Sequence, residues 1–180
     1  MHAIDSDTRL CGVVGHPLGH SLSPVIHNAG YQALDINFVY IALDAEDIEA
    51  CLSGFRAIHG FRGLSVTIPH KLAAIKYLDV VDSLSQKIGS VNTISKSAGA
   101  LVGTSTDGAG TLRAFEEAGV SLAGKRVLFL GSGGAVRAVS FAVAEESGAA
   151  AIQILGRTLV NVEALVSDLS ETTHANESGG

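Results

Sequence analysis

Tryptophan is absent from this 180-residue sequence, and cysteine is rare, with only Cys11 and Cys51. The two cysteines lie far apart within apolar patterns, so we expect free thiols in a reducing cytoplasm rather than a disulfide-stapled secreted fold. The sequence also lacks any apolar run long enough to span a membrane. Residues 1–10 are polar and contain no apolar signal core. We therefore expect a cytoplasmic protein without a membrane partner.

Charged residues are also few. They make up 17% of the sequence, with 12 basic and 18 acidic residues and a formal net charge of −6. The sequence has no basic cluster, which argues against a nucleic-acid partner. Hydrophobic residues reach 47% and glycines number 21, which is typical of a compact α/β protein rather than a disordered one.

Short apolar runs and helical patterns alternate along the chain. We expect strands at residues 10–15, 38–43, 64–68, 126–130 and 151–155. Because helical patterns separate these strands, the alternation predicts parallel sheets. The sequence Lys-Ser-Ala-Gly at residues 96–99 instead predicts a hairpin loop.

Polar residues stand where several helices are expected to begin. Ser23, before a proline, is expected to cap a helix that runs to about residue 34, and Asp44 to cap the next. Asp107 precedes a glycine, and on spacing alone it is favoured as a helix cap over a ligand. One residue can serve both purposes. Residues 71–78 are also expected to be helical.

The sequence Val-Leu-Phe-Leu-Gly-Ser-Gly-Gly-Ala at residues 127–135 predicts a strand, a glycine turn and a helix. A dinucleotide pyrophosphate needs such a turn, because the backbone approaches it closely and the helix N-terminus supplies N–H groups. Val136 stands at the usual third glycine position. The alternative is a tight turn with a structural role only.

The strand at residues 151–155 is followed by Gly156, Arg157 and Thr158. NAD-preferring sites usually carry an acidic residue at this place for the ribose hydroxyls, whereas an arginine suits a 2′-phosphate. This pattern favours NADP over NAD. Alternatively, Arg157 is a solvated surface side chain.

Lys71 follows the expected strand at residues 64–68 and a proline. This places it at the carboxyl end of a strand, where open α/β sheets keep their ligand crevice. A lysine there can donate a proton or bind an anion, and a surface lysine is the alternative. Metal binding is not expected, because Pro17 and Gly19 prevent a helix from aligning His16 with His20.

Four stretches taken together resemble the shikimate dehydrogenase family. They are Ser-Leu-Ser-Pro-Val-Ile-His-Asn at 21–28, Ser-Val-Thr-Ile-Pro-His-Lys at 65–71, Gly-Ser-Val-Asn-Thr at 89–93, and Ser-Thr-Asp-Gly-Ala-Gly at 105–110. The resemblance implies an α/β fold with a shikimate-binding domain at 1–106. It further implies an incomplete Rossmann-like NADP-binding domain at 107–170 and a polar tail at 171–180.

The family reduces 3-dehydroshikimate to shikimate with NADPH, in the biosynthesis of aromatic amino acids. By resemblance, Lys71 and Asp107 form the catalytic pair. The residues implied in substrate binding are Ser21, Ser23, Ser65, Thr67, Lys71, Asn92 and Asp107. Those implied in cofactor binding are Gly131, Ser132, Gly133, Gly134, Ala135, Gly156, Arg157 and Thr158. The partner is a small molecule, and the protein is expected to be a monomer or a homodimer.

This sequence departs from the family pattern at several positions. Ser65 and Ser105 stand where the family usually has asparagine, and Gly156 replaces the asparagine before Arg157. These changes leave open a quinate/shikimate dehydrogenase that uses NAD, or a non-catalytic module that binds shikimate. Family members continue well past residue 180, so we expect a truncated chain with little or no turnover of its own.

Overall fold

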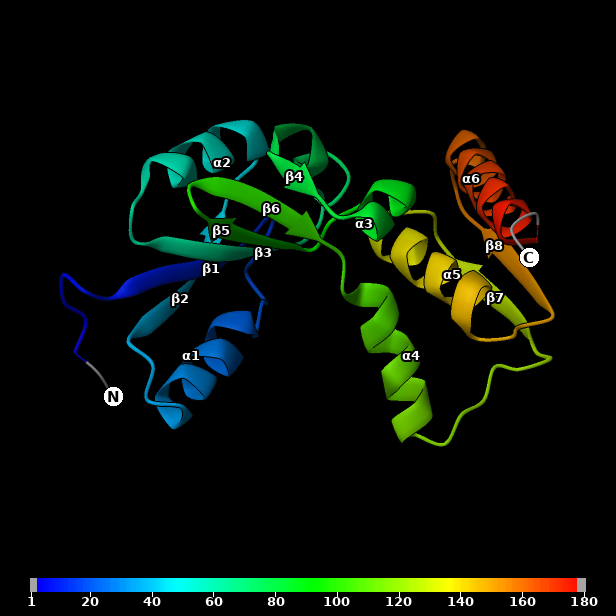
Figure 1. Cartoon of the computed structure of the whole chain (residues 1–180), viewed down its shortest axis with the longest axis horizontal. Helices are drawn as coiled ribbons and strands as arrows, with labels where there is room; N and C mark the ends of the chain where they lie inside the picture. Colours follow the sequence, from blue (N-terminus) through cyan, green and yellow to red (C-terminus); the bar gives the residue numbers. More distant parts are fainter. Residues whose placement is uncertain (1–2, 178–180) are drawn as a thin grey trace. The chain divides into compact units, whose positions relative to one another are not determined.

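The computed structural model describes residues 3–177, which form helices and strands of an α/β protein as predicted (Figure 1). Within this part of the chain there are two compact units. The first unit contains the residues up to Asp82 together with Val91–Thr104, and the second contains Ser83–Ser90 and the residues from Ser105 onward. The sequence did not indicate that Ser83–Ser90 groups with the second unit. A side-chain contact explains it, because Arg137 Nε donates a hydrogen bond to the Ile88 carbonyl at 2.7 Å.

The first unit is built around a sheet which, in the described residues, has six strands in the order β2-β1-β3-β5-β6-β4. Strands β1–β2, β1–β3 and β4–β6 pair in parallel, whereas β3–β5 and β5–β6 are antiparallel. The strands are β1 (Arg9–Gly15), β2 (Phe38–Asp44), β3 (Phe61–Val66), β4 (Val80–Val81), β5 (Thr93–Ser97) and β6 (Ala100–Thr104). The predicted parallel strands and the hairpin are therefore present, and the two-residue strand β4 was not predicted.

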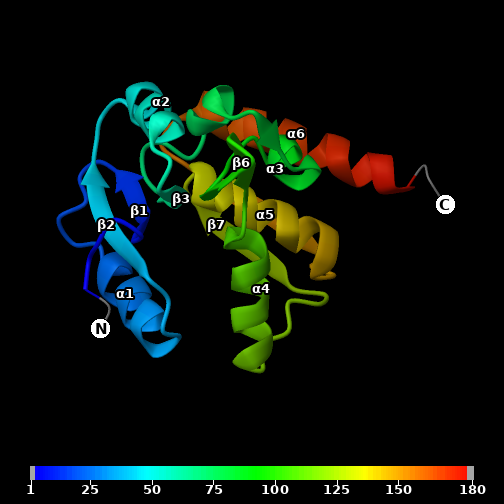
Figure 2. The same cartoon turned by 60° about the vertical axis from the view of Figure 1, so that its left-hand side comes forward.

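Helices α1 (Ser23–Ala33) and α2 (Ile48–Ala57) lie on opposite faces of this sheet (Figures 1 and 2). The face under α2 holds the main core. The face under α1 holds a smaller cluster of Cys11, Val13, Leu18 and Tyr40. Side chains of one strand point alternately to these two faces, so Val14 and Val13 enter different clusters. The carboxyl ends of β1, β2 and β3 meet at one edge of the sheet.

The predicted helix caps of the first unit are wrong by one to three residues. Ser23 is the first residue of α1, and Leu22 occupies the N-cap position. Asp44 ends β2, where it pairs with Gly15 of β1, so it is not free to cap a helix. Asp47 caps α2 instead, and its carboxylate accepts the Ala50 N–H at 2.9 Å.

The helix predicted at residues 71–78 is reduced to a 3-10 turn, η1 (Ala74–Tyr77). The preceding residues form hydrogen-bonded turns, in which the His70 N–H donates to the Thr67 carbonyl at 2.9 Å. The Lys71 carbonyl accepts the Val91 N–H at 3.0 Å. Because that carbonyl bonds to the segment before β5, it is not available to a regular α-helix.

The second unit contains α3 (Ser83–Ile88), α4 (Asp107–Glu117), β7 (Arg126–Leu130), α5 (Gly134–Glu146), β8 (Ala151–Leu155) and α6 (Leu159–Glu177). Strands β7 and β8 pair in parallel, with the predicted boundaries. Asp107 is the first residue of α4, and Thr106 takes the N-cap position that Asp107 was expected to hold. Helix α6 continues into the expected tail at 171–180, of which residues 178–180 lie outside the described residues.

Continuous apolar runs such as those of β7 and β8 are typical of strands buried on both faces, but this sheet is covered on one face only. Helices α5 and α6 bring Phe141 and Leu165 against one face, which also packs Ile154. On the other face Leu128, Leu130 and Leu155 are 57%, 73% and 63% exposed. No other element between residues 3 and 177 covers these three leucines. Among the same residues, no helix combines the length and apolarity needed to cross a bilayer.

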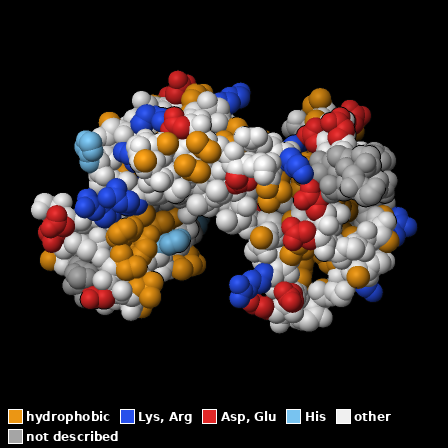
Figure 3. Space-filling model, viewed as in Figure 1, with side chains coloured by type: hydrophobic (Ala, Val, Ile, Leu, Met, Phe, Trp, Pro, Cys, Tyr) orange, Lys and Arg blue, Asp and Glu red, His pale blue; other side chains and the backbone are white. Residues whose placement is uncertain are grey.

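Charged side chains are distributed without a large patch of one sign on the face shown in Figure 3. Basic side chains stand at several separate places there, and acidic side chains lie among them. This agrees with the lack of a basic cluster in the sequence.

Candidate substrate and nucleotide sites

A cavity of about 540 Å³ opens in the first unit at the carboxyl ends of β1 and β3. The loop after β1 and the turn after β3 form its walls. It is lined by Val13, His16, Pro17, Leu18, Gly19, His20, Ser21, Ser23, Thr67 and Ile68. Three residues predicted to bind substrate, Ser21, Ser23 and Thr67, are therefore brought to one cavity. Their hydroxyls can donate to and accept from a polyhydroxylated ligand.

Thr67 is held at the rim by backbone contacts. Its N–H donates to the Val14 carbonyl at 2.9 Å, which extends the pairing of β3 with β1 beyond Val66. Gly15 packs directly against it. A Cβ atom at Gly15 would lie 2.4 Å from Thr67 Cγ2 and 2.7 Å from the Ile68 carbonyl oxygen. The Thr67 side chain therefore occupies space that only a glycine at position 15 leaves open.

The loop that carries Ser21 and Ser23 is anchored to the end of β2. Asp44 Oδ2 accepts the Leu18 N–H at 3.2 Å, and Asp44 Oδ1 lies 2.6 Å from His16 Nδ1. Glu46 Oε1 lies 3.4 Å from the other ring nitrogen of His16. The hydrogen bond between His16 and Asp44 raises the pKa of the imidazole and lowers the pKa of the carboxyl. This ion pair fixes the start of the loop next to the cavity.

Ser65 lies on β3, opposite Val13 of β1. Its Oγ accepts a hydrogen bond from the Tyr40 hydroxyl at 2.7 Å. Tyr40 is only 4% exposed, and burial raises the pKa of its phenol. The sequence patterns did not point to Tyr40, because its contact with Ser65 joins residues 25 positions apart.

Asn92 and Lys71 lie on neighbouring segments of the first unit. The Asn92 carbonyl accepts the Val66 N–H at 2.7 Å, and its own N–H donates to the Thr104 carbonyl at 3.0 Å. His70 anchors the turn before Lys71, since its Nε2 lies 2.6 Å from the Ala45 carbonyl oxygen and the side chain is buried. No local sequence pattern identifies this contact, which joins residues 25 positions apart.

Asp107 belongs to the second unit, at the first position of α4. Its carbonyl accepts the Thr111 hydroxyl at 2.8 Å. The next residue, Gly108, is buried against α5. A Cβ there would lie 2.7 Å from both the Ala138 carbonyl oxygen and Ala142 Cβ. This close approach fixes the start of α4 on α5. The pairing of Asp107 with Lys71 stays a prediction.

The predicted nucleotide residues lie together at the carboxyl ends of β7 and β8. Gly131 has a φ of +119°, which favours glycine, and its N–H donates to the Leu155 carbonyl at 2.7 Å. A Cβ at Gly156 would lie 3.4 Å from Ser132 Oγ. Residues 131–132 of the turn therefore adjoin the start of the loop after β8.

Helix α5 begins at the glycine turn. Gly133 occupies its N-cap position, and the first turn contains Gly134 and Ala135. The first N–H groups of a helix have no partner within the helix, so a phosphate can accept hydrogen bonds from them. Arg157 and Thr158 are exposed beyond β8. The arginine can contribute a positive charge to an anionic ligand.

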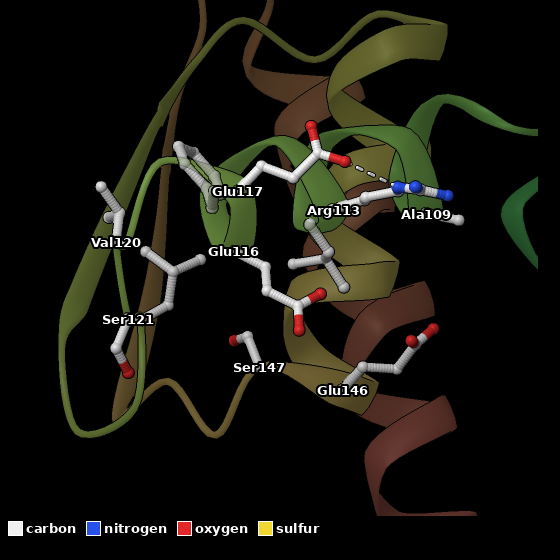
Figure 4. Close-up of a pocket in the computed structure, with 12 residues that line it drawn as sticks. Ala109, Arg113, Glu116, Glu117, Val120, Ser121, Glu146 and Ser147 are labelled. Carbon is white, nitrogen blue, oxygen red and sulfur yellow. Dashed lines mark hydrogen bonds and ion pairs between the residues drawn. The ribbon is translucent and has the colours of Figure 1, made fainter.

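A larger cavity, of about 940 Å³, lies elsewhere in the second unit. Figure 4 shows that α4, the loop after it and the end of α5 surround it, with the carboxylates of Glu116 and Glu146 on its wall. Arg113 Nε donates to Glu117 Oε1 at 2.9 Å. This cavity contains none of the residues predicted to bind substrate or cofactor. Within residues 3–177 no group of three or more metal-ligating side chains is placed to hold a metal ion.

Comparisons with known proteins identify relatives of this chain. Residues 13–94 match the shikimate dehydrogenase substrate binding domain. A shikimate dehydrogenase (NADP(+)) from Moorella thermoacetica is 48% identical over 160 residues, which cover 88% of this chain and 54% of that protein. The chain thus spans little more than half the length of this relative.

Solved structures give the same result. The Thermus thermophilus shikimate 5-dehydrogenase in complex with NADP(H) and shikimate has a TM-score of 0.81 and 37% identity, covering 91% of this chain and 61% of that one. The Listeria monocytogenes enzyme in complex with shikimate and NAD has a TM-score of 0.84 and 35% identity, covering 95% of this chain and 60% of that one. This chain belongs to the shikimate dehydrogenase family.

Proposed function

We propose that this chain acts in the NADPH-dependent reduction of 3-dehydroshikimate to shikimate, in the biosynthesis of aromatic amino acids. The observation that carries the proposal is the cavity at the carboxyl ends of β1 and β3, into which Ser21, Ser23 and Thr67 are brought. Relatives that are named for this activity, and a related structure that contains both shikimate and NADP(H), support it.

In this proposal Lys71 donates a proton to the carbonyl oxygen of the substrate. A lysine ammonium is charged at neutral pH, so reduction requires no earlier proton uptake. When bound, the nicotinamide supplies the hydride. Asp107 holds the ammonium and a substrate hydroxyl in position, while Ser21, Ser23, Ser65, Thr67 and Asn92 orient the ring by hydrogen bonds.

The nucleotide is proposed to bind at the turn after β7. Its pyrophosphate accepts hydrogen bonds from N–H groups of residues 132–135, and Arg157 binds the 2′-phosphate of NADP. The loop after β8 offers no carboxylate at residues 156–158 for the ribose hydroxyls of NAD. Since one related structure contains NAD, the competing candidate is a quinate/shikimate dehydrogenase that uses NAD.

We further propose a cytoplasmic location, consistent with the free thiols of Cys11 and Cys51. Small molecules are the proposed ligands, and the chain is proposed to be a monomer or a homodimer.

Calorimetric titration of the 180-residue chain with shikimate tests the substrate site directly. We expect shikimate to bind in a 1:1 ratio, with quinate as the competing ligand in a parallel titration. If neither shikimate nor quinate binds, the proposed substrate site is refuted. Tighter binding of quinate than of shikimate would favour the alternative dehydrogenase.

Because the 180-residue chain is expected to have little or no turnover of its own, the role of Lys71 is tested by consumption of 3-dehydroshikimate and NADPH in a form of the protein that continues past residue 180 as the relatives do. The substitution Lys71→Ala should lower the rate by roughly 10²–10⁴, the usual contribution of a general acid. Lys76→Ala is the matched control, since Lys76 is exposed on η1, and it should leave the rate unchanged. An equal effect of the two substitutions would contradict the role of Lys71. In that longer form, shikimate binding without NADPH consumption would favour a non-catalytic binding module.

A further inference from the structure

Helix α1 uses two side chains to hold a single residue of β2. Asn28 Nδ2 donates to the Tyr40 carbonyl at 2.8 Å, and Asn28 Oδ1 accepts the Tyr40 N–H at 2.9 Å. The His27 ring stacks on the Tyr40 ring, with centroids 4.1 Å apart and an interplanar angle of 5°. Because β2 is an edge strand, Asn28 bonds to its outer side as a neighbouring strand would. Tyr40 is thereby fixed in both backbone and ring.

The hydroxyl of Tyr40 is directed along the sheet to Ser65, whose Oγ it approaches to 2.7 Å. Since the phenol donates this bond, the Ser65 proton is free to be donated to another group. Among the residues that the structure describes, no group accepts it. Ser65 therefore keeps its O–H group as a donor, and the hydrogen bond from Tyr40 restricts the direction in which this O–H points.

Ser65 lies beside the walls of the substrate cavity. Val13, its partner on β1, lines the cavity, and so does Thr67, two residues further along the chain. Residues two apart along an extended segment point to the same face. The restricted proton of Ser65 is thus next to the place where the ring of a substrate would lie.

We propose that Tyr40 is a positioning residue for substrate binding, which orients the Ser65 hydroxyl so that it donates to an oxygen of the substrate. This inference rests on the proposed function. It also gives a role to His27 and Asn28, which lie in the same stretch as Ser21 and Ser23 but outside the cavity lining. Within residues 21–28, Ser21 and Ser23 contact the ligand, and His27 and Asn28 fix Tyr40.

A double-mutant cycle with Tyr40→Phe and Ser65→Ala tests the proposal by shikimate titration of the full 180-residue chain. Tyr40→Phe removes only the hydroxyl and keeps the ring that stacks on His27. Each single substitution should weaken shikimate binding roughly 5-fold to 10-fold, the effect of one lost hydrogen bond. The double variant should bind no more weakly than Ser65→Ala, because Tyr40 acts through Ser65.

Tyr31→Phe is the matched control, since Tyr31 packs on the same cluster under α1, and it should change the affinity less than 2-fold. His27→Leu is a second variant that keeps the Tyr40 hydroxyl and loosens its ring. It should cause a smaller loss of affinity that disappears in the Ser65→Ala background.

The outcomes separate the two proposals. Shikimate binding by the wild type, with additive losses in the double variant, would overturn the role of Tyr40 and leave the proposed function intact. Lower stability of Tyr40→Phe in urea with unchanged affinity would also overturn it. No shikimate binding by the wild type would overturn both.

Discussion

Gly15 and Thr67 are in such close contact that the smallest side chain at position 15 would overlap the threonine methyl group. A Cβ atom at Gly15 would lie 2.4 Å from Thr67 Cγ2, which is far below a van der Waals contact. The end of β1 therefore sets the position of a proposed substrate ligand that follows β3.

Gly15→Ala should displace Thr67 and weaken shikimate binding at least 10-fold, while it destabilises the first unit by about 1–3 kcal/mol through overpacking. Gly54→Ala is the matched control, because a Cβ at Gly54 has no neighbour within 4 Å among the described residues and Gly54 lies outside the cavity lining. Titration calorimetry and urea unfolding measure the two effects. Unchanged affinity in Gly15→Ala would show that the position of Thr67 does not matter for binding.

The pair of His16 and Asp44 predicts a pH window for stability. The pKa of Asp44 is lowered, so its contribution is present above its ordinary pKa of 3.8 and is lost as the pH falls through the folded value. The pKa of His16 is raised, so its contribution is complete below 6.5 and is lost as the pH rises through the folded value. Glu46 faces the same imidazole and also raises the pKa of His16.

The measurement compares wild type with His16→Gln in urea at pH values from 3 to 9. The difference in unfolding midpoint should be largest between pH 4 and 6.5 and should narrow on both sides. His20→Gln, in the same loop, is the control and should show no such window. A difference that grows above pH 7 would contradict the assigned ion pair.

Arg157 is expected to determine the preference for NADP over NAD. If it binds the 2′-phosphate, Arg157→Gln should weaken NADP⁺ binding roughly 10-fold or more, as expected when a charge-assisted hydrogen bond is lost, and should change NAD⁺ binding less than 2-fold. Arg126→Gln is a useful control, since Arg126 starts β7 at the strand end opposite to the glycine turn. Equal losses for both nucleotides on substitution of Arg157 would remove its assigned role.

The contacts of Arg137 predict that its substitution strongly lowers the stability of the second unit. Its side chain is 13% exposed, and its guanidinium donates to the Ile88 carbonyl at 2.7 Å and to Asp168 Oδ2 at 2.6 Å. Arg137→Met should therefore lower the unfolding free energy of this unit by about 2–3 kcal/mol. Arg113→Met removes an exposed pair with Glu117 on α4 and should cost only about 0.3 kcal/mol. Similar losses in urea unfolding would contradict the internal role of Arg137.

The sequence was sufficient to predict elements that depend on local patterns. The strands at residues 126–130 and 151–155 have the predicted bounds, because each apolar run ends at a glycine or a polar residue. The hairpin turn uses Ala98 and Gly99, both with positive φ, as expected for two-residue loops. Ser21, Ser23 and Thr67, which the family resemblance implies in substrate binding, line one cavity, and their role there stays a prediction.

Features that depend on distant contacts were not predictable in this way. Aspartate is a residue type that often caps helices. Asp44 nevertheless belongs to β2, because it pairs with Gly15 at the end of β1. The roles of Tyr40 and His70 arise from contacts across 25 positions of the chain. The burial of β7 and β8 depends on which faces are covered, and an apolar run does not reveal that.

The uncovered face of the β7–β8 sheet has a consequence for local unfolding, which should be more frequent in this sheet than in the first one. Strand β1 has a hydrogen-bonded neighbour on both sides, whereas β7 and β8 have only each other within residues 3–177. Local opening costs least where few contacts are lost. Backbone amides of β7 and β8 should therefore exchange with deuterium faster than those of β1. The rim that holds Thr67 would persist while the turn at Gly131 opens and recloses many times.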